Sequence, residues 1–160
     1  MKKLLLTFLT LSLLLTGCSS NNDSVNEDVT IDLQTLKSEV SDLVDPGFGE
    51  ALEQFGAMYD ATWVEQQLYM SEDLYEEIIV IGPNPMIGAR GFEVIMVKAA
   101  SGQETKVKEA LDKRVEYGSG PNTEFYGSMT NYNEVLNKGA YFFLVVGEEK
   151  LKAPIEEAIK

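Results

Sequence analysis

The chain alternates between stretches whose apolar residues recur every three or four positions and short stretches that are almost wholly apolar. The first spacing is typical of an amphipathic helix, and the second is typical of a strand that is covered on both faces. Residues 30–44 follow the helical spacing, and Asp45-Pro46-Gly47 then ends the predicted helix. Its expected buried face consists of Leu33, Leu36, Val40, Leu43 and Val44.

Two stretches that follow are less regular. Residues 50–60 place Leu52, Phe55 and Tyr59 on one side of a second predicted helix. Residues 63–70 are ambiguous, because Val64, Leu68 and Met70 fit a strand poorly although Leu68-Tyr69-Met70 has a strand-like composition. We interpret residues 63–70 as a short strand or an irregular edge.

Three strands and a well-defined helix come next. The runs at residues 78–81, 92–99 and 141–146 predict strands inside a sheet that helices cover. Ser101-Gly102-Gln103-Glu104 matches a capping box, so a helix is expected to begin directly after Ser101. The predicted apolar face of this helix, and the glycine expected to stop it, are Val107, Ala110, Leu111, Val115 and Gly118.

The last part of the chain predicts a short helix at residues 132–137, closed by Gly139, and a final helix at residues 153–160. Pro154 fits the first turn of that final helix, where a missing N–H costs nothing. A hairpin followed by a helical crossover to a third strand predicts a split β-α-β arrangement, with the first strand between the other two. We therefore expect an α+β domain with a small, mainly antiparallel sheet of three to four strands.

The N-terminal residues have the pattern of an export signal. Lys2 and Lys3 precede an apolar run at residues 4–15, which is too short for the ~20 residues that a membrane-spanning helix needs. We predict that residues 1–17 form a signal peptide cleaved between Gly17 and Cys18. Residues 18–29 are then a polar, flexible leash, and residues 30–160 are a single domain.

The ending Leu15-Thr16-Gly17-Cys18 resembles the lipobox of bacterial lipoproteins. That resemblance implies that the Cys18 thiol is diacylglycerated, so that palmitate-type chains hold the protein on the outer face of the cell membrane. Two acyl chains anchor stably, whereas one chain holds only marginally. The alternative is that Cys18 is a bystander in an ordinary cleaved secretory signal.

Charge and composition limit the partners and the chemistry. Removal of residues 1–17 takes away Lys2 and Lys3 and no acidic residue, which changes the formal net charge from −13 to −15. Nucleic acid and anionic lipid headgroups are therefore unfavoured as partners. The chain has no histidine, which excludes Ser-His-Asp and Cys-His nucleophilic sites and Cys/His zinc sites. We predict no catalytic residue, no metal site and no cofactor.

The candidate binding residues lie around the two arginines of the chain. Arg90 belongs to a connection at residues 82–91 that is long for a hairpin, and Met86 and Ile87 beside it could form a binding lip. Arg114 ends the capped helix, and each guanidinium offers a planar fork for a carboxylate or a phosphate. The alternative is that both arginines are solvated, with Arg114 serving only the helix dipole.

Other polar groups have simpler explanations. Glu93 and Lys98 are an odd number of positions apart on one strand, so they face opposite sides of the sheet and make a poor acid/base pair. An acidic stretch at residues 72–77 lacks the ligand spacing of a calcium loop and is read as a solvated edge. Several aromatic residues could form a ligand surface, although packing in the core and at its rim is the favoured explanation: Trp63, Tyr69, Tyr75, Tyr126 and Tyr132.

Three segments, at residues 91–98, 107–114 and 139–146, together resemble an uncharacterised domain family of Gram-positive lipoproteins. The resemblance covers about residues 30–160, but residues 118–121 replace a longer helical continuation found in that family. It implies a lipoprotein address and a fold, and it brings no known activity. We expect a lipid-anchored, extracytoplasmic, non-catalytic binding module with an envelope protein as partner. The alternatives are an envelope enzyme using carboxylate or Ser/Lys chemistry, or a small solute-capturing accessory protein.

Overall fold

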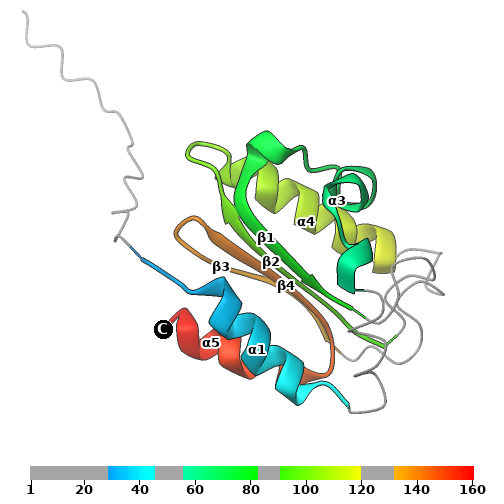
Figure 1. Cartoon of the computed structure of the whole chain (residues 1–160), viewed down its shortest axis with the longest axis vertical. Coiled ribbons are helices and arrows are strands. Elements are labelled where there is room, and N and C mark those ends of the chain that lie inside the picture. Colours follow the sequence, from blue (N-terminus) through cyan, green and yellow to red (C-terminus); the bar gives the residue numbers. More distant parts are fainter. Residues whose placement is uncertain (1–28, 46–55, 83–90, 120–131) are drawn as a thin grey trace, which may run out of the picture.

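A four-stranded antiparallel sheet lies between two layers of helices (Figure 1). This computed structural model describes residues 29–45, 56–82, 91–119 and 132–160. Helices α1 (Leu33–Leu43) and α5 (Ala153–Ala158) cover one face of the sheet, and α3 (Ala61–Leu68) and α4 (Glu104–Ser119) cover the other. Three short 3₁₀ turns, η2 (Gly56–Met58), η3 (Glu72–Leu74) and η4 (Glu149–Lys152), complete the described elements.

The strands are β1 (Tyr75–Ile81), β2 (Glu93–Ala99), β3 (Tyr132–Lys138) and β4 (Tyr141–Gly147). Their order across the sheet is β1-β2-β4-β3, and every neighbouring pair is antiparallel. The expected α+β domain with a mainly antiparallel sheet is therefore confirmed. The strand that splits the β-α-β unit is β4, which lies between the parallel strands β2 and β3. The expectation that the first strand lies between the other two is wrong, because β1 is an edge strand.

Two apolar clusters fill the space on either side of the sheet. The β4 residues alternate between them: Phe143 and Val145 face α1 and α5, whereas Phe142 and Leu144 face α3 and α4. All seven β4 residues are buried. This two-sided burial explains why the sequence of β4 is continuously apolar and has no period-two alternation.

Helix α1 confirms the first predicted helix. Leu33, Leu36 and Val40 are buried against the sheet. Asp32 caps the helix, because its carboxylate accepts hydrogen bonds from the backbone N–H groups of Gln34 (3.0 Å) and Thr35 (3.1 Å). The Thr35 hydroxyl also donates to this carboxylate at 2.7 Å, and these bonds hold the pKa of Asp32 below its ordinary value.

Helix α3 corrects the interpretation of residues 63–70 as a strand or irregular edge, which is wrong. The Asp60 carboxylate accepts a hydrogen bond from the Trp63 backbone N–H at 2.8 Å and so caps a helix. Val64 and Leu68 are one turn apart on that helix, and both are buried in the core. Tyr69 ends it in the left-handed conformation at φ 55°.

Helix α4 begins at Glu104, so the predicted start directly after Ser101 is wrong. Gly102 has φ +78°, which no helical residue adopts, and Gln103 N–H bonds to the Ala100 carbonyl at 2.9 Å to close a turn. The Glu104 carboxylate reaches back to the Gly102 N–H at 3.3 Å. The predicted apolar face is confirmed, since Val107, Ala110 and Leu111 are buried. The predicted stop at Gly118 is wrong, because α4 continues through Gly118 to Ser119.

The predicted short helix at residues 132–137 is wrong, because this segment is strand β3. It pairs along its whole length with β4, and Gly139, at φ +56°, lies in the tight turn between them. Val135 packs against one core cluster and Leu136 against the other, which only a strand allows for adjacent residues. The final helix is confirmed with Pro154 in its first turn and ends at Ala158. Of the helix expected at residues 50–60, residues 50–55 lie outside the described residues, and Gly56–Met58 form η2.

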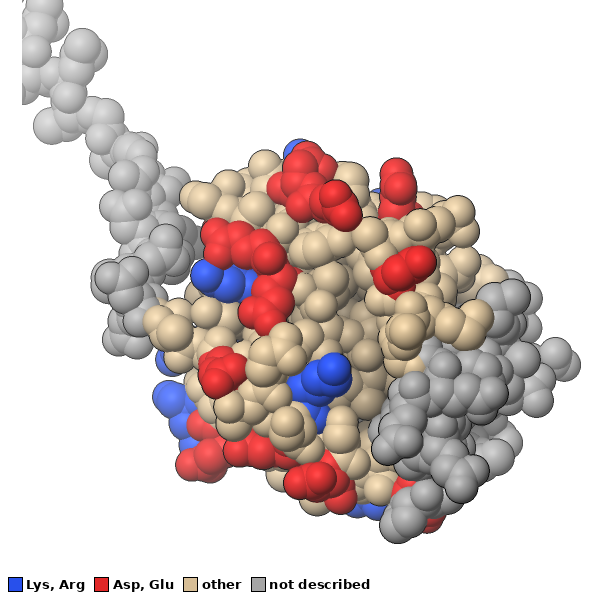
Figure 2. Space-filling model, viewed as in Figure 1, with Lys and Arg blue, Asp and Glu red and all other residues tan. Residues whose placement is uncertain are grey.

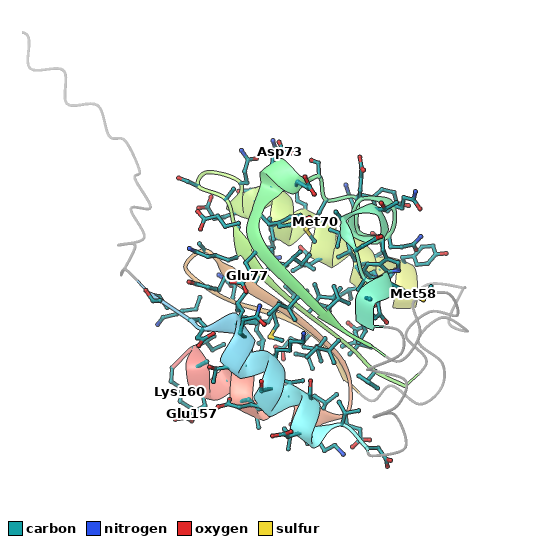
Figure 3. All side chains as sticks on the ribbon, viewed as in Figure 1. Met58, Met70, Asp73, Glu77, Glu157 and Lys160 are labelled. Atoms are coloured by element: carbon teal, nitrogen blue, oxygen red, sulfur yellow. The ribbon has the colours of Figure 1, made fainter. Side chains whose placement is uncertain are left out.

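The sheet has two ends that matter for the site. The described chain enters at Val29 at what we call the near end, where Gln34 Nε2 donates to Glu77 Oε1 at 2.8 Å. Figure 3 places Glu77, Glu157 and Lys160 toward this end, and Met58 at the opposite one. The opposite end, which we call the far end, holds the last residue of β1 and the first of β2, Ile81 and Glu93.

Candidate functional site

A buried ion pair at the far end joins the sheet to α4. Glu93 is the first residue of β2, and Arg114 lies on α4 on the same face as Val107 and Leu111. Arg114 Nη2 donates to Glu93 Oε1 at 2.8 Å, and Arg114 Nε donates to Glu93 Oε2 at 3.0 Å. The Glu93 and Arg114 side chains are only 1% and 3% exposed. Their two parallel bonds are the fork-to-fork geometry in which a guanidinium binds a carboxylate most strongly.

Two aromatic side chains lie beside this ion pair. The Arg114 guanidinium carbon lies 5.4 Å from the centre of the Trp63 ring, within the range of a cation–π contact. The Tyr59 ring meets the Trp63 ring edge-on, with 4.8 Å between centres and 81° between planes. We call Tyr59, Trp63, Glu93 and Arg114 the ion-pair cluster.

The backbone passes close to the cluster at Gly82. A Cβ at this position would meet the Tyr59 hydroxyl and would lie 3.2 Å from the Tyr59 Cζ. The absence of a side chain at Gly82 therefore leaves room for the Tyr59 ring. Burial raises the pKa of Tyr59, and the Glu93 carboxylate raises it further, whereas the Arg114 guanidinium opposes the shift. The phenol therefore stays neutral across the whole physiological range.

The chemistry of the cluster is that of a fixed internal pair. A carboxylate held by both of its oxygens acts as a base only after the ion pair is broken, which is costly in a buried position. Trp63 Nε1 is also buried and has no hydrogen-bond partner among the described residues. The cluster thus ties α3, α4 and β2 together at the far end.

Of the binding candidates chosen from the sequence, only Arg114 lies among the described residues. Arg114 is 4% exposed and engaged with Glu93, so the interpretation of this arginine as a solvated dipole partner is wrong. Arg90, Met86 and Ile87 lie outside the described residues, as do Gly17 and Cys18. One signal for the ion pair was present, because Arg114 continues the helical stripe of Val107 and Leu111 at the i+7 position.

Glu93 and Lys98 do face opposite sides of the sheet, as the odd spacing predicts. Glu93 faces α4, whereas the Lys98 ammonium lies 2.5 Å from the exposed Glu76 carboxylate. The hydrogen bond from Lys98 to Glu76 raises the pKa of Lys98. In the acidic stretch, Glu72, Asp73 and Glu76 are exposed, and Glu77 accepts its bond from Gln34. Within the described ranges, no three ligand-type side chains gather where they could hold a metal ion.

The aromatic candidates do not form one described surface. Trp63 belongs to the ion-pair cluster, and Tyr75 packs against the core. Tyr69 is 74% exposed at the end of α3. Tyr126 and the side chain of Tyr132 lie outside what the structure describes.

A small cavity opens at the far end on the opposite face of the sheet, and sequence reasoning missed it. Its volume is about 140 Å³, and its lining comes from the end of α1, the residues just before β2, and η4. Lys150 at its rim forms an ion pair with Glu148 at 2.9 Å. The lining residues are Val44, Asp45, Gly91, Phe92, Glu148, Lys150 and Leu151.

The surface around these features is dominated by carboxylates. Acidic side chains are spread across the face shown in Figure 2 with fewer basic ones between them, as expected for 26 acidic and 13 basic residues. The helices of the described ranges are too short or too polar to cross a bilayer. No model of a known protein family matches the chain, and neither a curated protein nor a solved structure does.

Proposed function

We propose that the chain is a lipid-anchored, extracytoplasmic protein whose domain binds a partner in the cell envelope and catalyses no reaction. The observation that carries this proposal is the N-terminal pattern of Lys2-Lys3, an apolar run at residues 4–15, and Leu15-Thr16-Gly17-Cys18. Cys18 is the single cysteine of the chain, and a polar segment follows it directly. That combination favours an acylated cysteine over a bystander in a secretory signal.

The anchor and the charge of the domain complement each other. Each acyl CH₂ that enters the bilayer contributes roughly 0.8 kcal/mol, so two chains hold the protein on the membrane. The eleven Cα–Cα steps from Cys18 to Val29 span at most about 40 Å. An acidic domain on such a tether is repelled by anionic headgroups, which keeps its surface available to other proteins.

The described part of the site favours binding over the two alternatives. Glu93, the buried carboxylate of the described residues, is engaged by Arg114 in a bidentate pair and would have to leave it to act as a base. The far-end cavity of about 140 Å³ is smaller than the ~300–1,000 Å³ of typical small-molecule sites. A cavity of that size suits one side chain of a partner better than a captured solute.

Metabolic labelling with a palmitate analogue tests the anchor. The wild-type chain and a Ser19→Ala control are expected to incorporate the label and to sediment with membranes, whereas Cys18→Ala is expected to do neither. Label that survives Cys18→Ala, or a wild-type chain that stays unlabelled, would refute the anchor.

A second experiment tests the binding role. A photo-crosslinking amino acid at Lys150 is expected to give one stoichiometric protein adduct on intact cells, and the same probe at Lys160 is expected to give less. Equal labelling of many proteins from both positions would contradict a specific partner.

A further inference from the structure

We infer that the far end of the sheet is the partner-binding end, and that its cavity takes one apolar side chain from a basic segment of a partner protein. This inference rests on the proposed function, because the lipid anchor attaches the domain to the membrane through its near end.

The first step is the placement of the cavity relative to the point of attachment. The described chain enters the domain at Val29, and Figure 1 shows that α1 runs from there to the far end, where Val44 lines the cavity. The C-terminal residues Glu157 and Lys160 lie toward the near end (Figure 3). A domain tethered through Val29 therefore presents its far end to other proteins more readily than its near end.

The second step is the size and lining of the cavity. Val44, Phe92 and Leu151 contribute apolar walls and are 9%, 4% and 2% exposed. An apolar cavity of ~150 Å³ holds a ring of the size of benzene. The volume of about 140 Å³ is therefore enough for one branched or aromatic side chain.

The third step is the charge at the rim. Asp45, Glu148 and Lys150 are exposed there, and the Lys150 ammonium is already 2.9 Å from the Glu148 carboxylate. Two carboxylates and one ammonium therefore lie at the rim, so its formal charge is negative, in a chain whose formal net charge is −13. A second copy of the chain carries the same sign and is repelled, whereas a segment with lysines or arginines on both sides of an apolar residue is attracted.

Three fluorescent peptides test whether such a segment binds. Their binding to the full chain in zwitterionic nanodiscs is measured by fluorescence anisotropy. One peptide has leucine between lysine pairs, the second has glycine in its place, and the third has leucine between glutamate pairs. Burial of the leucine side chain predicts that the first peptide binds about tenfold tighter than the second. The third peptide is expected not to bind.

A matched pair of variants locates the site. Glu148 and Glu157 are both exposed glutamates that form an ion pair with a nearby lysine, Lys150 and Lys160 respectively, but only Glu148 lines the cavity. Glu148→Lys is expected to weaken binding of the leucine peptide about tenfold, and Glu157→Lys is expected to change it less than twofold. Val44→Phe, which fills the cavity, should remove the advantage of leucine over glycine. Because Glu148 and Glu157 are surface positions, their comparison decides the question even where Val44→Phe fails to fold.

Several outcomes would overturn the inference. Equal affinity for the leucine and glycine peptides would mean that charge alone acts, and equal effects of Glu148→Lys and Glu157→Lys would place binding elsewhere. Dimers in analytical ultracentrifugation that Glu148→Lys dissolves would make a second copy the occupant. Palmitate labelling separates this failure from that of the proposed function, since a labelled chain without peptide discrimination refutes only the inference. Selective binding by an unlabelled chain refutes only the anchor.

Discussion

Replacement of Arg114 by methionine is expected to destabilise the domain more than any substitution of an exposed charge. The guanidinium makes two hydrogen bonds to Glu93, at 2.8 and 3.0 Å, and both side chains are almost fully excluded from water. Methionine fills much of the same volume but leaves the Glu93 carboxylate without this counter-ion. Removal of one partner of a buried ion pair typically costs about 3–5 kcal/mol. That is a large share of the ~5–15 kcal/mol by which most domains are stable.

Urea unfolding of the full chain in mild detergent, followed by far-ultraviolet circular dichroism, measures this loss. With a urea dependence of roughly 1–3 kcal/mol per molar, the midpoint of Arg114→Met should fall by about 2 M. Lys98→Met is the control, because Lys98 also pairs with a glutamate on the neighbouring strand but at an exposed position. Its midpoint should barely change.

The double variant Glu93→Met/Arg114→Met completes the cycle. With both charges gone, no uncompensated ion remains in the core, so the double variant should be more stable than either single variant. The reasoning is refuted if Arg114→Met costs no more than Lys98→Met, or if the losses of the single variants simply add. Fluorescence of Trp63, the single tryptophan, gives a local readout because the Arg114 guanidinium lies 5.4 Å from its ring centre.

Three further predictions concern local features. Asp60→Ala removes the cap of α3 and should cost about 1 kcal/mol in urea unfolding, with Asp60→Asn recovering most of it; equal losses in both variants would argue against the cap. Gly82→Ala should displace the Tyr59 ring, so its midpoint should fall clearly in the wild-type background and less in Tyr59→Phe, which lacks the oxygen that the new methyl would meet. Asp32 has a lowered pKa, so its charge stabilises the domain above its unfolded pKa of 3.8 and ceases to do so as the pH falls through the folded value. Asp32→Asn should therefore lower the melting temperature near pH 7 and have a progressively smaller effect as the pH falls below 3.8. A difference of constant size across that pH range would contradict this assignment.

The parts of the fold that could be predicted are those whose sequences have a single explanation. The continuous apolar runs of β2 and β4 require burial on both sides, and the stripe of Val107, Ala110 and Leu111 requires a helix. Strand β3 could not be predicted in the same way, because it is an edge strand and most of its residues are polar. Its two central residues contact different core clusters, and this contact exists only once β4 is beside it.

The candidate site was harder to predict than the fold because its parts are distant in sequence. Glu93 and Arg114 are 21 residues apart. Each is a charged residue of a type that usually lies at the solvent-exposed surface. Only the packing of α4 on β2 brings them together and buries them. The cavity depends similarly on the packing of η4 against the end of α1, which no local pattern in Leu151 or Val44 indicates.

The central position of β4 has a consequence for the order in which the chain can fold. Residues 141–147 form the strand that joins β2 to β3, so until this late segment is available the sheet consists of a hairpin and a detached strand. When only the residues before Tyr141 have left the ribosome, both apolar clusters still lack the side chains that β4 contributes. Completion of the sheet therefore waits until residues 141–147 have been synthesised.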